Sequence, residues 1–277
     1  MKQKLVISGY GWLAGYLGDA LQQTLDIVGT SRNDDKLALL SKKGISGVKF
    51  ALGDNTRELQ KHLNGATFVI NIPPGRRNTN LASFTKNMCT LVDDAISANV
   101  AHIVFISTTS VYGDSTDNTL TEEAPLHPET ESAKAHVAVE QYLAERLSSK
   151  CDSHRSTHYT CVRLAGLVGP DRHPANSLSG RTVGKGNKRV NLVYITDVVS
   201  ALKKIVTAPT EEKLYHLCAN EHPKRGEYYV AAAEALQVTP PVFSETDNKP
   251  CGKVIDASQS WEKLGIVPQY ASPDAMF

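Results

Sequence analysis

The sequence predicts an α/β fold in which helices cover both faces of a parallel sheet. Short apolar runs bounded by Gly, Asp or Ser alternate with segments of helical composition as far as about residue 168. The runs are apolar almost throughout, which is typical of strands buried on both faces. Strands that alternate regularly with helices favour a doubly wound parallel sheet of the Rossmann type.

The expected elements follow one another in a regular order. The strands are Lys4–Ser8, Ile27–Thr30, Val48–Ala51, Phe68–Ile72, Ile103–Ser107, Tyr159–Leu164 and Leu214–Cys218. The helices between them include Tyr16–Thr24, Lys36–Lys43, Asn80–Ala98 and Ser132–Ser148.

The C-terminal part of the chain breaks this pattern. After residue 168, Pro, Gly and Arg become frequent, and a short strand at Asn191–Ile195 and a helix opened by Asp197 follow. We expect residues 1–168 plus 190–218 to form a nucleotide-binding Rossmann domain. Residues 169–189 plus 219–277 are then expected to form a small C-terminal lobe that binds substrate. In open α/β sheets ligands bind at the carboxyl ends of the strands, so the lobe should grow from that edge.

Composition limits the classes of partner. The 277 residues contain 30 Lys and Arg against 29 Asp and Glu, a net charge of +1, so the chain lacks the basic character of a nucleic-acid or membrane-surface binder. No apolar stretch is long enough to span a bilayer, and we expect no signal peptide. The five cysteines are scattered without metal-site spacing. We therefore expect a small-molecule ligand, no metal and a cytoplasmic location.

A glycine-rich turn follows the first strand. The stretch Gly9-Tyr10-Gly11-Trp12-Leu13-Ala14-Gly15 fits the dinucleotide-binding pattern G-x-G-x-x-[G/A]. Gly9 permits a tight turn, and Gly11 lets the backbone approach a pyrophosphate. The N-terminus of the following helix can donate amides to phosphate, and Trp12 and Leu13 are expected to contact the cofactor. Such a turn can also serve packing alone, but its place between the first strand and a helix favours dinucleotide binding.

The end of the second strand normally selects the cofactor. An Asp or Glu there would hold the ribose hydroxyls of NAD, but this strand ends in Thr30-Ser31-Arg32. A guanidinium beside two hydroxyls suits the 2′-phosphate of NADP, since Arg bonds phosphate bidentately. The alternative is an ordinary solvated arginine. The sequence thus favours NADP over NAD.

Other loop residues are weaker candidates. Asp54, after the third strand, suits either an adenine amino group or a turn. Pro73, after the fourth strand, would turn the backbone past the cofactor, although consecutive prolines also simply end a strand. Several basic side chains suit either a rim for a phosphorylated substrate or a solvated loop: Arg76, Arg77, Arg172, His173 and Arg181.

Four motifs, in this order along the chain, resemble those of the extended and atypical short-chain dehydrogenase/reductases, the NAD(P)-dependent epimerase/dehydratase family. They are Gly9–Gly15, Ser107–Gly113, Arg163–Pro170 and Val193–Val198. The resemblance implies a dinucleotide-binding protein of this fold. It also implies that a serine or threonine of the hydroxyl run bonds the substrate oxygen. That position falls on Thr108, with Thr109 and the cofactor-contacting Ser107 beside it.

The same resemblance implies a general acid/base Tyr and, four residues later, a Lys on the next helix. Aligning Glu140 with the glutamate that usually follows the lysine places Ser132 at the Tyr position and His136 at the Lys position. Both share a helical stripe with apolar residues, which should face the sheet. A serine hydroxyl is too weak an acid to replace a phenol, and histidine is mostly neutral at about pH 7. Lys134 lies on another side of the helix and should be solvated.

Three hypotheses follow. The first is an oxidoreductase or epimerase/dehydratase-type enzyme that moves a hydride between NADPH and a carbonyl or carbinol carbon of a small, sugar-linked substrate. Thr108 would orient the oxygen, and His136, Tyr112 or Tyr194 would serve as acid or base. Ser132 is the candidate that occupies the position of the catalytic Tyr. The second is a non-catalytic NADPH-binding sensor or regulatory protein, and the third is an enzyme of another class on the same scaffold. His136 is also open to a structural role or to holding the nicotinamide ribose. The resemblance implies a monomer or a homodimer paired through the two long helices.

Overall fold

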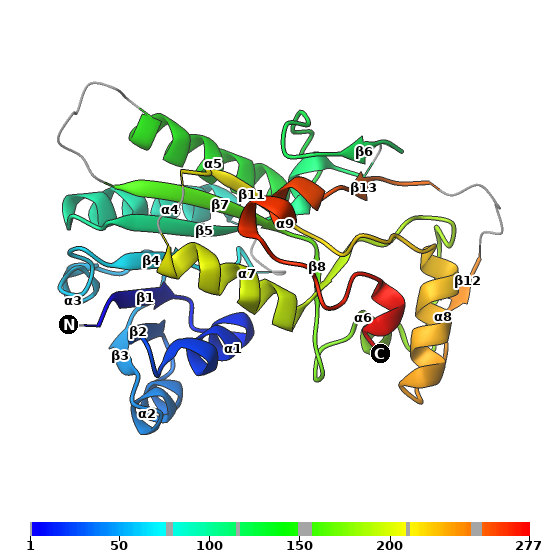
Figure 1. Cartoon of the computed structure of the whole chain (residues 1–277), viewed down its shortest axis with the longest axis horizontal. Helices are drawn as coiled ribbons and strands as arrows, with labels where there is room; N and C mark the ends of the chain where they lie inside the picture. Colours follow the sequence, from blue (N-terminus) through cyan, green and yellow to red (C-terminus); the bar gives the residue numbers. More distant parts are fainter. Residues whose placement is uncertain (1, 76–79, 115–116, 149–156, 209–210, 245–250) are drawn as a thin grey trace. The chain divides into compact units, whose positions relative to one another are not determined.

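A computed structural model of the chain describes residues 2–75, 80–114, 117–148, 157–208, 211–244 and 251–277. It confirms the predicted α/β architecture, with a seven-stranded sheet in the order β11-β7-β5-β4-β1-β2-β3 (Figure 1). The pairs β1·β2, β1·β4, β2·β3 and β4·β5 are all parallel. The strands are β1 (Lys4–Ser8), β2 (Asp26–Ser31), β3 (Ser46–Lys49), β4 (Thr67–Ile70), β5 (His102–Thr108), β7 (His158–Leu164) and β11 (Leu214–Leu217).

One strand lies earlier in the chain than expected. The sequence predicts Val48–Ala51, whereas β3 covers Ser46–Lys49 and pairs its Val48 with Thr30 of β2. β3 is the edge strand of the sheet, and three of its four residues are exposed. An edge strand needs fewer apolar side chains, so polar Ser46 and Gly47 join it without cost to the core.

The helices of the first part of the chain are α1 (Trp12–Leu21), α2 (Asp34–Lys42), α3 (Arg57–Gln60), α4 (Leu81–Ser97) and α5 (Glu131–Ser148). α1 starts at Trp12, four residues before the expected start at Tyr16, because the glycine turn is shorter than the sequence suggests. α4 and α5 pack together and share a buried core with alternate residues of β1, β4 and β5: Val6, Phe68, Ile70, Ile103, Phe105, Met88, Val92, Val139 and Leu143.

The second part of the chain contains shorter elements. They are β6 (Thr119–Leu120), β8 (Gly166–Val168), α6 (Pro174–Leu178), β9 (Thr182–Val183), β10 (Leu192–Tyr194), α7 (Ile195–Thr207), α8 (Arg225–Ala235), β12 (Val242–Phe243), β13 (Val254–Ile255), α9 (Ser258–Leu264) and two 3-10 turns, η1 (Thr109–Tyr112) and η2 (Pro273–Ala275). Three two-stranded pairs, β8·β10, β9·β12 and β6·β13, are parallel. A separate buried cluster joins α6, α8 and β10 through residues such as Ala175, Leu192, Tyr228 and Ala232.

Packing divides the chain into two compact units. Unit 1 comprises residues 1–111, 128–162 and 202–214, and unit 2 comprises residues 112–127, 163–201 and 215–277. The expected division by ligand, 1–168 plus 190–218 against 169–189 plus 219–277, stays a prediction. By packing alone, residues 112–127 and 163–168 group with unit 2. No helix in the described part of the chain has the length and apolar character needed to cross a membrane.

Candidate cofactor and active site

Gly9 shapes the turn after β1. Its φ is +82°, and a Cβ built on it would lie 2.5 Å from the backbone oxygen of Asn71, so both conformation and packing require glycine here. The Gly9 amide donates to Thr30 Oγ1 at 3.0 Å, and Asn71 Nδ2 donates to the Gly9 oxygen at 3.1 Å. These bonds hold the turn at the end of β1 and β4, where the sheet presents its carboxyl edge.

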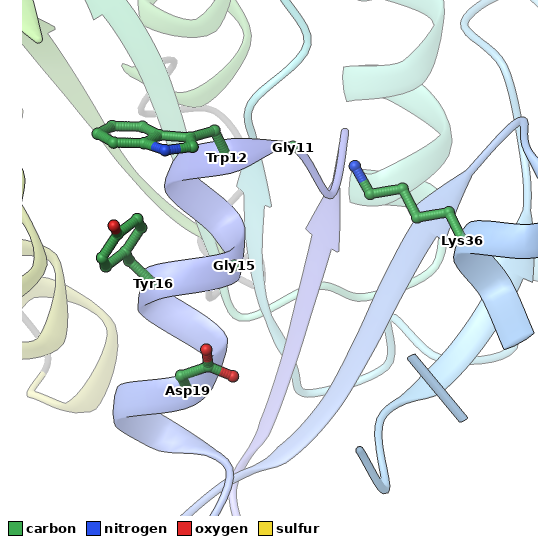
Figure 2. A pocket seen from close by; sticks show the side chains of 6 residues that line it. All are labelled: Gly11, Trp12, Gly15, Tyr16, Asp19 and Lys36. Atoms are coloured by element: carbon green, nitrogen blue, oxygen red, sulfur yellow. The ribbon is translucent and has the colours of Figure 1, made fainter. Parts of the chain in front are cut away.

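Gly11 and Gly15 have a different reason to lack side chains. The φ of Gly11 is −92°, and a Cβ built on it would meet only one backbone oxygen, at 3.8 Å. A Cβ on Gly15 would meet nothing within 4 Å. Both residues line an open groove of about 410 Å³ along α1, with Trp12 and Tyr16 on one side and Lys36 on the other (Figure 2). Neither conformation nor packing requires these two glycines, and their missing side chains keep the groove open.

The first turn of α1 is available to a ligand through its backbone. The N-cap residue Gly11 makes no side-chain hydrogen bond to that turn. The Leu13 side chain is buried in the core at 6% exposure, so only its amide suits the phosphate contact expected from the sequence. An uncapped helix N-terminus favours an anion through its amide dipoles.

The hydroxyls at the end of β2 have separate roles. Thr30 is 2% exposed and accepts the Gly9 amide, so it stabilises the glycine turn and does not join the expected phosphate site beside Arg32. Ser31 Oγ accepts the Asn33 amide at 3.1 Å, which leaves the Ser31 proton for another acceptor. Arg32 is exposed and forms no ion pair with any residue that the structure describes.

Lys36 is a groove residue that the sequence reasoning missed. It lies in the first turn of α2, and its ammonium points toward the turn that holds Gly11 (Figure 2). Among the described residues its side chain has no ion-pair partner, whereas Lys43 and Lys49 pair with carboxylates at 2.7 Å. A lysine in a helix's first turn opposes the helix dipole, and that was the available signal.

The two loop candidates have ordinary local surroundings. Asp54 Oδ2 accepts the Ala51 amide at 2.8 Å, so the turn alternative accounts for this side chain. Its contact with adenine stays a prediction, as does the contact of the exposed Pro73 with the cofactor. Arg76 and Arg77 lie outside the described residues.

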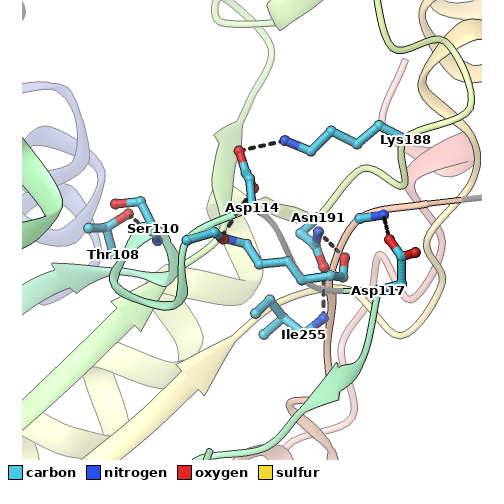
Figure 3. A network of polar contacts seen from close by, with 10 residues as sticks. Thr108, Ser110, Asp114, Asp117, Lys188, Asn191 and Ile255 are labelled. Carbon is cyan, nitrogen blue, oxygen red and sulfur yellow. Dashed lines mark hydrogen bonds and ion pairs between the residues drawn. The ribbon is translucent and has the colours of Figure 1, made fainter. Parts of the chain in front are cut away.

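The hydroxyl run lies at the carboxyl end of β5 and continues into η1. Ser107 is buried, and its hydroxyl donates to Glu140 Oε1 of α5 at 2.5 Å. Thr108 is only half buried, and its Oγ1 accepts the Ser110 amide at 3.2 Å (Figure 3). Because the Ser107 proton is committed to Glu140, Ser107 can only accept a bond from a ligand. Thr108 keeps its proton to donate.

His136 and Ser132 lie on the side of α5 that faces the core, as the stripe predicts. His136 is 7% exposed, and its ring centroid lies 5.9 Å from that of Phe105 on β5. Its Nδ1 donates to the Ser132 backbone oxygen at 2.8 Å, which leaves Nε2 as the acceptor of a neutral ring. Burial lowers the pKa of His136, against the raising effects of this bond and of Glu140. His136 therefore supplies no standing positive charge.

Lys134 is solvated, as expected. It is exposed and pairs with Glu131 at 2.6 Å on the outer side of α5. It cannot stand in for the lysine missing at position 136, because it leaves the helix on a different side.

The two tyrosines proposed as relocated acids are already engaged within unit 2. Tyr112 is 2% exposed, and its hydroxyl lies 2.6 Å from His216 Nε2 and accepts from Arg163 at 2.5 Å. Tyr194 stacks on Tyr270 with ring centroids 3.9 Å apart. These contacts hold both rings within unit 2, and an acid or base role for either hydroxyl stays a prediction.

Two other expectations need correction. His173 is not part of a cationic rim: it is buried, bonds Tyr228 Oη through Nε2 at 2.8 Å, and burial lowers its pKa. Asp197 does not open its helix, because α7 begins two residues earlier, at Ile195. Its carboxylate accepts the amides of Gln269 and Tyr270 at 2.8 and 3.0 Å, and burial raises its pKa although these bonds oppose the rise. Asp197 thus holds the C-terminal segment of unit 2.

Unit 2 carries an additional charged cluster. Asp114 bonds Lys188 at 2.6 Å and lies 3.4 Å from Lys253, which is almost fully buried (Figure 3). The two lysines lower the pKa of Asp114 against the effect of burial. Among the described residues, no group of His, Cys, Asp and Glu could hold a metal ion.

Comparison with known families gives one match over most of the chain. The model of the NAD dependent epimerase/dehydratase family matches residues 5–218. Protein YeeZ of Escherichia coli strain K12 is 30% identical over 279 residues, which cover 99% of this chain and 98% of that protein.

Solved structures of other proteins have the same fold. The Bordetella bronchiseptica enzyme WbmG, in complex with NAD and UDP, superposes with a TM-score of 0.80 at 14% identity and covers 100% of this chain and 92% of its own. The UDP-glucose 4-epimerase of Thermotoga maritima, with UDP-glucose, gives a TM-score of 0.78 at 15% identity over 99% of this chain and 97% of its own. At these identities the likeness concerns the fold.

Proposed function

Because the chain belongs to the NAD dependent epimerase/dehydratase family, we propose that it binds NADP at the β1–α1 turn and acts on a carbonyl or carbinol carbon of a small substrate. When bound, the nicotinamide would supply or accept a hydride. The observation that carries this proposal is the open groove beside Gly11 and Gly15, where glycine is needed by neither the backbone nor the packing. The uncapped first turn of α1 offers amide donors for the pyrophosphate.

NADP is proposed over NAD because of the charges after β2. Arg32 is exposed without an ion-pair partner among the described residues, and Ser31 has a proton to donate. The end of β2, Thr30-Ser31-Arg32, contains no carboxylate that could hold the ribose hydroxyls of NAD. The structurally similar WbmG was solved with NAD, so the proposed preference for NADP would distinguish this chain from WbmG. Titration with both cofactors tests the preference.

The substrate is proposed to resemble a nucleotide sugar, as the similar structures with UDP-glucose or UDP suggest. The Thr108 proton would bond the substrate oxygen, which is the acceptor in a carbonyl compound. Neutral His136, with Nε2 as its acceptor, suits the removal of a proton from a hydroxyl better than the delivery of one.

A second candidate function is favoured by the α5 side chains. Ser132 and the neutral His136 replace the acidic phenol and the fixed cation that the family resemblance implies. A chain with an intact cofactor groove and without that pair fits an NADPH-binding sensor or regulatory protein, because binding requires only the groove.

Cofactor binding is tested with Gly11→Val. The variant should fold with unchanged stability, because a Cβ at this position has room and the φ of −92° suits an L-residue. Its side chain would fill the groove and abolish the fluorescence enhancement of NADPH that the wild type should show. Normal NADPH binding by Gly11→Val, or no binding by the wild type, would reject the groove as the cofactor site.

Catalysis is tested by incubating the protein with NADPH and a panel of aldehydes, ketones and nucleotide sugars, and following NADPH absorbance. Turnover that falls in Thr108→Ala and His136→Ala would support the enzyme. Turnover unaffected by either change would reject the assigned residues, and NADPH binding without turnover would favour the sensor.

Two further expectations are kept as proposals. A cytoplasmic location is consistent with the free thiols of the described cysteines Cys89, Cys161, Cys218 and Cys251, while Cys151 lies outside the described residues. A monomer or a homodimer is expected, which sedimentation equilibrium would distinguish.

A further inference from the structure

We propose that Lys36 is a specificity-determining residue, whose ammonium completes the binding site for the 2′-phosphate of NADP together with Arg32 and Ser31. This inference rests on the proposed cofactor function and adds the residue that balances the phosphate charge. A phosphate monoester carries a charge of about −1.5 to −2 near neutral pH. Arg32 supplies one positive charge, so a second cation would bring the site close to charge balance.

The position of Lys36 suits this role. Among the residues that the structure describes, it is the one basic residue that lines the groove, and its ammonium points toward the turn of Gly11 (Figure 2). Arg32 precedes the N-cap residue Asn33 of α2, and Lys36 follows it by three residues. The two basic side chains therefore flank the start of the same helix at the end of β2.

The charges around the two basic residues leave them available. Lys49 pairs with Asp34 at 2.7 Å, which neutralises a carboxylate in the first turn of α2. Asp19, which lines the groove, pairs with Lys43 at 2.7 Å. The remaining negative charge is that of Asp35, which is exposed and has no ion-pair partner among the described residues. Arg32 and Lys36, neither of which pairs with a described residue, outweigh it and leave a local excess of positive charge.

The backbone donors of α2 are partly in use. Asn33 Oδ1 accepts the Lys36 amide at 3.1 Å, and the Asn33 amide donates to Ser31 Oγ at 3.1 Å. A phosphate at this end of α2 would therefore be held chiefly by side chains. Ser31 would donate its hydroxyl proton, and the two basic residues would donate charge-assisted N–H bonds.

The test measures dissociation constants for NADPH and NADH in the full chain by fluorescence titration. Lys36→Met should weaken NADPH binding about tenfold, the size expected for one charge-assisted hydrogen bond, and leave NADH binding unchanged. Lys36→Arg should retain the NADPH preference. The matched control is Lys42→Met, which removes the same charge from the exposed far end of α2 and should change neither constant.

Competition with nucleotide fragments locates the effect. In the wild type, 2′,5′-ADP should displace NADPH more strongly than 5′-AMP, and the difference should shrink in Lys36→Met. Equal losses for NADPH and NADH would overturn the inference, because Lys36 would then contact a group that both cofactors share. A Lys42→Met loss as large as that of Lys36→Met would also overturn it. If the wild type binds neither dinucleotide, the proposed function itself fails.

Discussion

The Thr108 hydroxyl can donate its proton to a ligand, because among the described residues its oxygen only accepts, from the Ser110 amide. Ser107, one residue earlier, has the opposite character because its proton is bound to the buried Glu140. The neighbouring hydroxyls thus differ in what they can offer. A substrate carbonyl needs a donor, which Thr108 supplies and Ser107 does not.

Thr108→Ala should lower kcat/KM for the best carbonyl substrate about 100-fold, the size seen when one donor to a reacting oxygen is removed. Thr108→Ser should retain most of the activity, because it keeps the hydroxyl. The NADPH dissociation constant should be the same in all three proteins. Full activity in Thr108→Ala would show that the substrate oxygen binds elsewhere.

The Tyr10 hydroxyl is buried and forms no hydrogen bond with any described residue. Tyr10 is 5% exposed, and burial, assisted by Asp19, raises its pKa to about 12. Tyr10→Phe should therefore raise the free energy of unfolding by about 1 kcal/mol. Tyr112→Phe, which loses bonds to His216 and Arg163, should lower it by about 1 to 3 kcal/mol. Urea denaturation of both variants checks the signs, and a shared sign would contradict this account.

Helix α1 contains two glycines that should respond in opposite ways to the same substitution. A Cβ on Gly15 would meet nothing within 4 Å, whereas one on Gly18 would lie 1.8 Å from Tyr10 Oη. Gly15→Ala should stabilise the protein by about 0.5 to 1 kcal/mol, since alanine favours the helix. Gly18→Ala should destabilise it, because the buried Tyr10 ring must move. Thermal unfolding of the pair, each the control for the other, decides the matter.

Asp197 connects α7 to the C-terminal segment of unit 2. Asp197→Ala would leave the amides of Gln269 and Tyr270 without their acceptor, at a cost of about 1 to 3 kcal/mol each where they are buried. We expect faster proteolytic cleavage near residues 269 and 270. Ser200→Ala, on the same helix, removes only an exposed bond to Thr196 and should cleave at the wild-type rate. Equal cleavage rates in the two variants would argue against the anchoring role.

Buried neutral histidines should make the whole protein sensitive to acid. Burial, with a contribution from His158, lowers the pKa of His102 from 6.5 to about 4, and burial also lowers the pKa of His136, His173 and His222. The unfolded chain takes up protons first as pH falls below about 6.5, so stability is full above this pH. It is lost progressively between about pH 6.5 and about pH 4, below which the folded His102 is also protonated, and His102 alone accounts for about 3 kcal/mol.

Urea denaturation at several pH values between 7 and 4 measures this loss. His102→Gln should lose less stability over the range than the wild type, because its amide does not titrate and can still donate to Thr160 Oγ1. His127→Gln, a change at an exposed position, should follow the wild type. A flat profile for the wild type would contradict the assignment.

Much of the architecture could be predicted from the sequence. β1 has the expected bounds, Lys4–Ser8. β7 and α5 differ from expectation by one residue at one end, and β5 and α4 differ by one residue at each end. These elements are long or fully buried, so their apolar pattern is strong. The short elements of unit 2, such as β9 and β12, have two residues each and leave no periodic signal.

The sequence predicted where the candidate site lies better than it predicted what each side chain does there. The glycine turn and the hydroxyl run lie at the carboxyl ends of β1 and β5, as the strand order requires. Thr30 was assigned with Arg32, but it is buried beneath the glycine turn. Lys36 was missed because its one local signal, a lysine in the first turn of a helix, does not tell whether the side chain lines a groove or faces solvent.

The sequence by itself determines the order of strands and helices, the glycine turn and the absence of the Tyr and Lys pair on α5. Each of these features depends on residues close together in sequence. Which hydroxyl keeps its proton and which basic residue lines the groove depend on contacts between distant residues. Ser107 meets Glu140, Thr30 meets Gly9, and Lys36 meets the groove of α1 only after β1, β2 and β5 have paired into one sheet. The local sequence does not predict such partners, because hydrogen bonds and ion pairs depend on distances in space between residues that are far apart in the chain.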